Sequence, residues 1–510
     1  MRKRSPSFAG SWYEADPDKL KRQLDNYLEQ AGAQLKETPF DHSFEGNAQP
    51  KPPVLAIIAP HAGYMFSGQT AAFAYRQAKE QKPSRIFLLG PSHYVGFEGA
   101  MLPAETAFST PLGDLLIDTS VIQELKELPL FRVSSDVHKR EHSLEMQLPL
   151  IRQTFGDVQI VPIIVGNLGD ETEVAMVAAM VKRFLRSGDL IVVSSDFTHF
   201  GPRYDFEPFR TNLKDNIRKL DSEAFEYLSR TDLRGFMEFR ERTSDTICGF
   251  YPCSVLLSLL PPNSYCSLLN YRTSQDTLVE DDRNSVSYMA LAFSHPDQKE
   301  WGEGALDSAS AAVLSAPEKK NLLLLARKTL EKFVKGDRNF DDPMLKQLAS
   351  PGMHKKSGVF VTLYKVPPGS RQRVDRLHKD LRGCIGYIWP VKSLFESVID
   401  NTIGACSRDY RFVPVTNSEL DDLRIDINVL TPPRRIDSHT DIVVGRDGVI
   451  MYKDGKQAVF LPSVATEFGW DVPELLTQLS LKAGLAGDGW KQGAKFDVFQ
   501  SDSFEEGEDL

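Results

Sequence analysis

Cysteine is scarce in this sequence of 510 residues, and its arrangement excludes several classes of protein. The five cysteines form no CxxC pair, so neither a zinc knuckle nor an iron–sulfur cluster motif is present. Their odd number favours reduced thiols over a disulfide framework. The cysteines are Cys248, Cys253, Cys266, Cys384 and Cys406.

Long apolar runs and an excess of positive charge are also lacking. No apolar run approaches the ~18 residues of a membrane span, and the basic start of the chain is followed by no apolar segment of the kind found in secretory signals. We therefore expect a cytoplasmic protein without a membrane partner. The formal net charge of −10 argues against non-specific nucleic-acid binding, because phosphate neutralisation requires a basic surface.

The chain is too long for one typical domain, and its composition changes once. Polar and small residues dominate from His295 until an amphipathic helical pattern begins near residue 319. We expect a first domain over residues 1–297, a linker over 298–318, a second domain over 319–502 and an acidic tail over 503–510.

The two domains differ in their predicted fold class. Uniformly apolar strands at 54–60, 85–91, 158–166 and 190–197 alternate with helical segments in the first domain. This pattern predicts an α/β fold with a mainly parallel central sheet covered on both faces. The second domain mixes helices with shorter strands, which predicts an α+β fold.

Polar side chains follow the apolar strands of the first domain. His61 follows one strand, His93 the next, and Asp196 and His199 follow a third. Ligands of open α/β sheets bind beyond the carboxyl ends of the strands, so these side chains are expected to converge. With the thiol of Cys248, they offer the ligand types that divalent transition metals prefer.

The segment HKREHSLEM adds His138, Glu141, His142 and Glu145 to the candidates. HKREH also fits the H-x-x-E-H pattern of inverted zinc proteases, in which two histidines on one helix face bind zinc. That interpretation leaves His61 and the other strand-end groups unexplained. Any single histidine could instead cap or hydrogen bond the backbone, and a lone cysteine is usually a small buried hydrophobe.

The long motifs along residues 9–293, and the order in which they occur, resemble those of the Memo family, whose members are relatives of the class III extradiol dioxygenases. The motifs are AGSWY, IIAPHAGY, LGPSHYVG, TPLGDLLID, EHSLEMQLP, VPIIVGNL, VVSSDFTHFG, DTICG and NSVSYMALAF. The resemblance implies a mononuclear non-heme metal site on His61, His93 and Cys248, with iron as the first choice and copper or zinc as alternatives. Extradiol dioxygenases have a carboxylate as the third ligand, so the thiolate of Cys248 is a departure from their pattern.

The same resemblance suggests roles for further residues. His199 resembles the acid/base histidine of the family, with Asp196 expected to fix its tautomer and raise its basicity, and we add His142 to the catalytic candidates. Trp12 and Tyr13 would form an aromatic wall over the metal or, equally, pack the amino terminus. Tyr64 and Glu145 complete the expected ligand contacts.

The second domain resembles the AMMECR1 domain across nearly all of residues 320–500, most specifically in LRGCIGYIWP. Arg382 could lower the pKa of Cys384 and create a nucleophile, or Cys384 could pack inside a buried turn, with Arg382 shaping a pocket for an anionic or polar ligand. We expect the packed alternative. Asp447 and Ser480 replace a histidine and a cysteine of many relatives, which weakens any mechanism that needs those groups.

Memo and AMMECR1 domains recur with a radical-SAM protein in the AmmeMemoRadiSam system, so a radical-SAM protein is an expected partner. Two functional hypotheses follow from the resemblance and the strand-end groups. The first is a metal-dependent oxidoreductase of extradiol-dioxygenase type with an unknown substrate. The second is a scaffold that binds a metal, a small molecule or a peptide without turnover.

Overall fold

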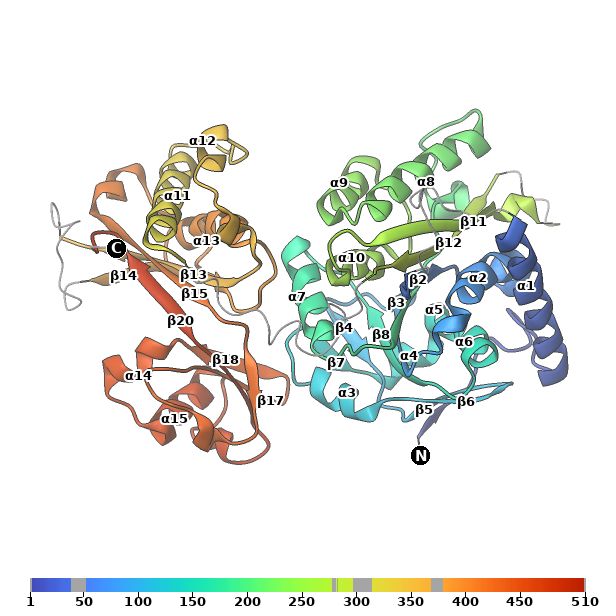
Figure 1. The fold of residues 1–510 in the computed structure, drawn as a ribbon, viewed down its shortest axis with the longest axis horizontal. Coiled ribbons are helices and arrows are strands. Elements are labelled where there is room, and N and C mark those ends of the chain that lie inside the picture. The colour runs from blue at the N-terminus through green and yellow to red at the C-terminus, as the bar shows by residue number, and fades with distance from the viewer. Residues whose placement is uncertain are drawn as a thin grey trace. The chain divides into compact units, whose positions relative to one another are not determined.

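The computed structural model describes residues 2–37, 52–277, 281, 283–296, 314–367 and 379–508. The chain divides into two compact units, Met1–Glu303 and Gly304–Leu510 (Figure 1). Most of the expected linker, residues 298–313, lies outside the described residues. Among the described residues, no helix combines the length and the apolar content needed to cross a membrane.

A mixed sheet of nine strands forms the centre of the first unit, with strand order β10-β12-β2-β9-β3-β8-β4-β7 and β11 paired to β12. The four strands in the middle of this order, β2, β9, β3 and β8, run parallel, whereas β12 and β4 join them antiparallel on either side. The strands are β2 (Val54–Ala59), β3 (Arg85–Pro91), β4 (Ala100–Leu102), β7 (Phe131–Val133), β8 (Gln159–Val165), β9 (Asp189–Ser194), β10 (His199–Phe200), β11 (Tyr265–Thr273) and β12 (Ser285–Ser294). The α/β prediction is confirmed, with a parallel centre and antiparallel flanks.

Helices cover both faces of this sheet, as the complete burial of β2, β3 and β9 requires. Helix α2 packs on β2 and β12 and is covered by α1, whereas α10 packs on β3 and β9 and is covered by α7. A small sheet of β1 (Lys3–Arg4), β5 (Ala107–Thr110) and β6 (Gly113–Leu116) completes the strands of the unit. The helices are α1 (Pro17–Glu37), α2 (Tyr64–Ala78), α3 (Thr119–Leu125), α4 (Ser135–Arg140), α5 (His142–Glu145), α6 (Leu148–Phe155), α7 (Glu171–Lys182), α8 (Leu213–Ser229), α9 (Leu233–Thr243) and α10 (Phe250–Leu259).

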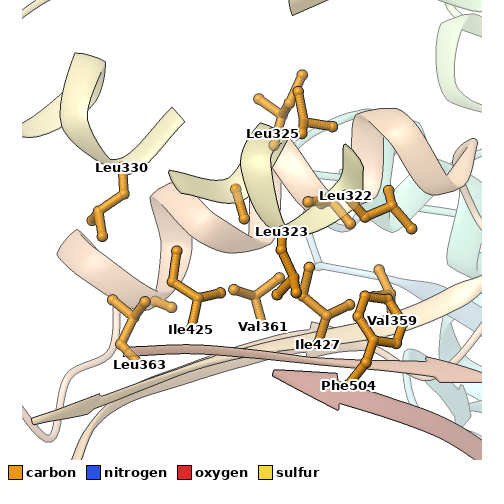
Figure 2. Packing of buried hydrophobic residues seen from close by; sticks show 14 of the residues in the cluster. Leu322, Leu323, Leu325, Leu330, Val359, Val361, Leu363, Ile425, Ile427 and Phe504 are labelled. Carbon is orange, nitrogen blue, oxygen red and sulfur yellow. The ribbon is translucent and has the colours of Figure 1, made fainter. Parts of the chain in front are cut away.

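The second unit contains two four-stranded sheets, of order β14-β13-β15-β20 and β16-β19-β17-β18. The apolar face of the first sheet packs against helices through residues such as Leu323, Val361, Ile425 and Phe504 (Figure 2). Full burial of each such side chain contributes roughly 1.5–3 kcal/mol. The strands are β13 (Gly358–Lys365), β14 (Asp380–Tyr387), β15 (Leu423–Leu430), β16 (Arg434–Ile436), β17 (Gly448–Lys453), β18 (Lys456–Phe460), β19 (Lys495–Phe499) and β20 (Ser501–Glu505). The helices are α11 (Ala316–Val334), α12 (Pro343–Lys346), α13 (Leu394–Ser407), α14 (Pro462–Phe468) and α15 (Val472–Lys482).

The expected acidic tail is wrong over its first three residues, 503–505. Residues Ser501–Glu505 form β20, which pairs with β15, and Phe504 is 1% exposed in the core. One apolar residue at the correct position of the alternating pattern is enough to add this strand to the sheet despite its acidic neighbours. Helix α11 also begins at Ala316, within the expected linker.

Candidate metal centre

Three neighbouring parallel strands place polar side chains at one edge of the sheet. His61, His93 and Asp196 each lie two residues beyond the end of β2, β3 and β9, respectively. Because these strands are adjacent and parallel, their carboxyl ends meet. The ring centroids of His61 and His93 are 5.1 Å apart, so the expected convergence is present.

The hydrogen bonds of Ser194 fix the tautomer of His61. The Ser194 hydroxyl lies 2.6 Å from the Ser143 carbonyl oxygen, to which it can only donate. Ser194 Oγ must therefore accept from His61 Nδ1, 2.9 Å away, and this leaves a lone pair on His61 Nε2. His61 is 1% exposed, and this burial, together with the nearby His93 and His142, holds its pKa well below the ordinary value.

A buried amide completes the support of this histidine. Tyr75 donates to Gln147 Oε1 over 2.8 Å, which orients the Gln147 amide so that Nε2 donates to Ser194 Oγ, also over 2.8 Å. Ser194 Oγ then accepts two hydrogen bonds and donates one. Its hydrogen-bonding capacity is fully used, so the tautomer of His61 cannot change without breaking a buried bond.

Glu141 favours the Nδ1-protonated tautomer of His93, as Ser194 does for His61, but with a carboxylate as the acceptor. One carboxylate oxygen lies 2.8 Å from His93 Nδ1, and the other accepts the His93 backbone N–H over 2.7 Å. Burial alone would raise the pKa of Glu141, but its hydrogen bonds to His93 and the nearby imidazoles lower it to about 2. An ionised carboxylate accepts the Nδ1 proton, so His93 Nε2 also carries a lone pair.

Cys248 lies in the turn before α10 and brings its sulfur to these two rings. Its Sγ is 3.2 Å from His61 Nε2 and accepts the Asp196 backbone N–H, also over 3.2 Å. Burial and the charge of Asp196 raise the pKa of the thiol well above its ordinary value. The Cys248 S–H can therefore donate to His61 Nε2 or to the Asp196 carbonyl oxygen, 3.4 Å away.

Ligand atoms of His61, His93 and Cys248 all lie within 4.8 Å of one another. Two imidazole nitrogens with free lone pairs and one sulfur form a donor set suited to a divalent transition metal. A second group of His93, Glu141 and His142 meets the same distance criterion, but it shares His93, and its Glu141 is already occupied by the hydrogen bonds to that residue.

His142 lies against this cluster without a hydrogen bond at its buried Nδ1 atom. Its ring stacks on His93 with centroids 4.2 Å apart and contacts Trp12 at 4.6 Å. Burial and the nearby His93 lower the pKa of His142 to about 3, so the ring is neutral at physiological pH. The expected catalytic candidate is thus beside the proposed ligands, where a neutral imidazole can exchange a proton.

His199 also lies at the site, but the expected role of Asp196 beside it is wrong. His199 Nδ1 faces the carbonyl oxygens of Phe197 and Thr246 at 2.8 and 3.1 Å, so backbone acceptors fix the tautomer. Asp196 Oδ1 instead accepts the His61 backbone N–H over 2.7 Å and holds the turn that carries this histidine. Burial lowers the pKa of His199 to about 4 and raises that of Asp196 to about 7.

These groups open onto a cavity of about 710 Å³. Trp12, Met65 and Phe66 supply apolar surface to its lining, whereas Arg203 and Asn284 supply polar groups. This cavity is large enough for a small molecule or a side chain of a peptide.

Three expected ligand contacts are not part of this lining. Tyr13 is buried and donates to Glu145, and Tyr64 donates to the Met146 carbonyl oxygen over 2.7 Å. Glu145 is fully buried and pairs with Arg4 at 2.7 Å while accepting backbone N–H groups of Ser7 and Phe8. Of the expected aromatic pair, Trp12 therefore lines the cavity and Tyr13 packs the amino-terminal segment.

The inverted zinc protease pattern does not form one helix face. His138 belongs to α4, whereas His142 begins α5 after an extended Glu141 with φ −80° and ψ 122°. His138 Nε2 hydrogen bonds to the Met101 carbonyl oxygen over 3.0 Å, so this ring nitrogen has a structural role. The two histidines therefore do not face a common metal position.

Cys384 lies in the middle of β14, the strand at one edge of the first sheet of the second unit. Its Sγ accepts the Thr362 hydroxyl over 3.2 Å, and its backbone N–H donates to Asp409 over 2.9 Å. Burial raises the pKa of this thiol, against the smaller effects of the Thr362 hydrogen bond and the charge of Arg411. The nearby guanidinium is thus Arg411, which Asp409 itself neutralises at 2.6 Å.

Arg382 lies in an ion pair rather than beside the thiol. Its guanidinium forms a two-pronged ion pair with Glu419 at 2.8 and 3.2 Å, 37 residues along the chain, and is 9% exposed. Glu419 thereby offsets the positive charge that would attract an anion. The expected pocket around Arg382 for an anionic or polar ligand stays a prediction.

The glycines of LRGCIG have packing roles. A Cβ at Gly383 would lie 2.1 Å from the Ala405 carbonyl oxygen of α13, and one at Gly386 would lie 2.3 Å from the Phe360 ring. Gly383 therefore allows the strand to approach α13, and Gly386 leaves room for the Phe360 ring of the neighbouring strand β13. Packing therefore accounts for most of the motif.

The other two departures noted in the second unit are structural residues. Asp447 pairs with Arg446 at 2.8 Å and accepts the Val443 backbone N–H. Ser480 is fully buried in α15, where its hydroxyl bonds to the Leu476 carbonyl oxygen over 2.9 Å.

Comparison with known proteins identifies a family for each of the two domains. The model of the Memo-like protein family matches residues 4–292, and the AMMECR1 model matches residues 323–504. The chain belongs to the Memo family. It carries this Memo domain fused to an AMMECR1 domain.

Two curated relatives illustrate the extent of the match. The chain is 35% identical to Protein MEMO1 of Xenopus tropicalis and 34% identical to Protein MEMO1 of Homo sapiens. Each alignment covers 57% of this chain and 97% of the relative. Among solved structures, an uncharacterised protein from Pyrococcus horikoshii is 35% identical over 38% of this chain and 93% of that chain, with a TM-score of 0.34.

Sequence reasoning missed Ser194 and Gln147 and assigned no partner to Glu141. Ser194 is a polar residue at the end of an apolar strand within VVSSDFTHFG, which is a signal that it belongs to the site, although it supports His61 rather than the histidine of that motif. Gln147 and Glu141 stand in the HKREHSLEMQLP segment, but nothing in its pattern tells which of its polar residues reaches His93. Arg203 lies outside the quoted motifs, and Asn284 begins NSVSYMALAF, although nothing in that motif marked it as a cavity residue.

Proposed function

We propose that the Memo domain is a metal-dependent oxidoreductase of extradiol-dioxygenase type that holds one iron ion on His61, His93 and Cys248. The observation that supports this most strongly is the locked tautomer of both histidines. Each Nδ1 proton is held by a buried acceptor, so both Nε2 lone pairs are free at the place where Cys248 brings its sulfur. Histidine ligands of metals are typically oriented in this way.

Iron bound there would supply Lewis-acid and redox chemistry next to the cavity. A soft thiolate also suits copper and zinc, so the donor set alone does not choose the metal. The remaining groups of the site would accept or donate protons. His199 has its Nδ1 proton held by carbonyl oxygens and a pKa lowered to about 4, so its Nε2 atom is a neutral base at physiological pH.

The substrate proposed for this site is a small molecule or a peptide side chain. The apolar surface of Trp12, Met65 and Phe66 would bind a planar or aliphatic body, and Arg203 and Asn284 would bind polar substituents. His142 and His199 would then stand beside the reacting group, each able to accept a proton.

Metal content tests the ligand set. The full chain is purified without chelators, loaded with ferrous iron under anaerobic conditions and analysed by inductively coupled plasma mass spectrometry. We expect about one iron per chain in the wild type and none in His61→Ala or His93→Ala. His439→Ala, a histidine of the AMMECR1 domain that contacts Trp490, is the matched control and should keep its iron. Equal iron in all four proteins would contradict the proposal.

A second function, a binding scaffold without turnover, is favoured by one observation. The third ligand is a thiol rather than the carboxylate of extradiol dioxygenases. Oxygen uptake by the iron-loaded chain, measured with a panel of catechol-like compounds, separates the two functions. Substrate-dependent uptake that His199→Ala removes supports the enzyme, and ligand binding without uptake supports the scaffold.

We also propose that the two domains act on a shared substrate or product, with a radical-SAM protein as partner. The fusion holds both domains at high effective concentration, which favours transfer of a ligand between them. Analytical ultracentrifugation of the chain mixed with a purified radical-SAM protein from the same source tests the partnership. Independent sedimentation of the two proteins would contradict it.

A further inference from the structure

Two buried carboxyl groups meet a single hydroxyl behind His199. Thr198 Oγ1 lies 2.7 Å from Asp221 Oδ1 and 2.9 Å from Asp245 Oδ2. Asp221 belongs to α8 and Asp245 to the segment that follows α9, and each is 1% exposed. Neither group touches the cavity, and the proposed chemistry does not use them.

A count of hydrogens shows that one of these carboxyl groups carries a proton. A threonine hydroxyl has one hydrogen and can donate it to only one of the two acids. Toward the other acid Thr198 can only accept, and an ionised carboxylate has nothing to donate. Two ionised carboxylates around one hydroxyl would also repel each other in a site without water contact.

The surrounding donors indicate that the proton belongs to Asp245. Asp221 accepts from the Tyr271 hydroxyl at 2.8 Å and from the Thr198 backbone N–H at 3.3 Å, as an ionised carboxylate does. Asp245 Oδ1 accepts the Ile247 N–H at 2.9 Å, and among the described residues Thr198 is the only partner of Asp245 Oδ2. The shorter distance to Asp221 also suits a hydroxyl that donates to an anion.

The charged groups nearby leave this assignment in place. Arg240 of α9 favours ionised Asp245, but its effect is smaller than those of burial and of the Asp221 charge, which raise the pKa of Asp245 to about 6, so Asp245 carries the proton below about pH 6. Burial raises the pKa of Asp221 as well, but hydrogen bonds from Ser287 of β12, Thr198 and Tyr271 of β11 favour its ionised form. The Arg218 guanidinium stands over the Tyr271 ring at 5.5 Å. Burial raises the pKa of Tyr271, and the charge of Asp276 adds to this effect.

The backbone on either side of these groups carries the functional side chains. Thr198 directly precedes His199, and Asp245 directly precedes Thr246, whose hydroxyl accepts the His199 N–H and donates to the His199 carbonyl oxygen, each over 2.8 Å. The second segment continues to Cys248, whose sulfur accepts a hydrogen bond from the first segment.

We propose that Asp245, Thr198 and Asp221 form a one-proton latch that ties these two segments together and thereby positions His199 and Cys248. Asp245 donates to Thr198, and Thr198 donates to Asp221. The latch residues are positioning residues, and what they position rests on the function proposed above for His199 and Cys248.

Infrared spectroscopy of the full chain detects the proton itself. At pH 5.5 in deuterated buffer, wild type minus Asp245→Asn should show the carbonyl stretch of a protonated carboxylic acid. The difference spectrum is needed because Asp196 and Asp426 also have raised pKa values and can contribute to the same region. A difference spectrum with no such band would overturn the assignment of the proton to Asp245.

Matched variants test whether the latch positions the site. Asn at position 245 keeps a donor toward Thr198 and an acceptor toward Ile247, and Thr198→Ser keeps the shared hydroxyl, so both should bind iron nearly as the wild type does. Thr198→Val removes the hydroxyl at equal size and should weaken iron binding by about tenfold or more, as loss of support around metal ligands does. Equal affinity of Thr198→Val and Thr198→Ser would overturn the positioning role.

An NMR titration of His199 separates positioning from mere structural support and does not need a metal. In the metal-free wild type, the His199 ring resonances should shift a second time as Asp245 ionises, and Asp245→Asn should lose that second shift. A second shift that persists in Asp245→Asn would overturn the latch. If the wild type binds no iron, the function proposed above fails, while the infrared band and the titration still decide the latch.

Discussion

Two of the three half-buried cysteines, Cys248 of the Memo domain and Cys384 of the AMMECR1 domain, have different neighbours. Burial raises the pKa of both thiols. Cys248 faces an imidazole nitrogen with a free lone pair, whereas Cys384 accepts a hydroxyl and lies near a guanidinium that Asp409 already neutralises. Both thiols thus lie half-buried within a short glycine-containing motif, and they differ in the hydrogen-bond partner of the sulfur.

Replacing each of the two thiols with a hydroxyl should give the largest difference in iron affinity between the two sites. We expect Cys248→Ser to weaken iron binding by about 100-fold or more, because a hydroxyl is a far poorer ligand than a thiolate. Cys384→Ser should leave iron binding unchanged. Competition with a coloured iron chelator measures both, and a similar loss in the two variants would show that iron affinity reports folding rather than ligation. Cys253→Ser, in the helix that follows Cys248, controls for loss of a buried thiol in the same domain.

The carboxylates that support each site provide the next test. Glu141→Gln should lower iron affinity by about 10–100-fold, since a neutral amide no longer holds the Nδ1 proton of His93 as strongly. The matched variant Glu419→Gln removes the carboxylate that pairs with Arg382 and should not affect iron. Isothermal titration calorimetry under anaerobic conditions gives both affinities. Unchanged affinity in Glu141→Gln would show that His93 does not depend on this carboxylate.

A smaller effect is expected from pH. The raised pKa of Cys248 means that the thiol keeps its proton in the metal-free protein at neutral pH, so iron binding must release it. His61 and His142 are already neutral there, because their pKa values are lowered. Iron affinity should therefore rise by about tenfold per pH unit between pH 6 and 8 and fall as the pH is lowered. Affinity measured in buffers across this range checks the slope, and a flat profile would mean that the thiol is already ionised or does not bind.

The smallest effect concerns the stability of the AMMECR1 domain. Cys384→Ala should lower the free energy of unfolding by about 1 kcal/mol, because it removes a packed sulfur and leaves the Thr362 hydroxyl without its acceptor. Iodoacetamide should label Cys384 in the folded chain much more slowly than in the chain unfolded with urea. Urea titration and mass spectrometry of the labelled peptide measure the two quantities. Rapid labelling in the folded state would show that Cys384 is an activated thiol after all.

The sequence predicted those parts of the site that depend on periodicity. His61, His93 and Asp196 follow apolar strands, and parallel strands bring such positions to one edge whatever their separation along the chain. Cys248 belongs to a turn before a helix, so no strand pattern marked it. The metal-binding chemistry of its thiol made it a candidate beside the strand-end groups, and the resemblance to the Memo family assigned it the role of a ligand.

The sequence could not predict which polar groups pair across long separations. Glu141 and Glu145 are four residues apart in one motif, yet Glu141 supports His93 and Glu145 binds the amino-terminal segment. Arg382 is adjacent in sequence to the Cys384 motif, but its charge is neutralised by Glu419. Such choices depend on the three-dimensional path of the backbone, which hydrophobic patterning leaves open.

The position of β12 within the central sheet has a consequence for synthesis of the chain on the ribosome. This strand is the last of the Memo domain in sequence, yet it pairs with β2, which forms early in the chain, and with β10, which carries His199. Contacts between such distant segments are slow to form, and here they require nearly the whole domain to have emerged. Until β12 emerges, the open edge of β2 leaves backbone N–H and C=O groups unpaired, so nascent Memo domains should be clients of ribosome-associated chaperones until Ser294 has left the ribosome.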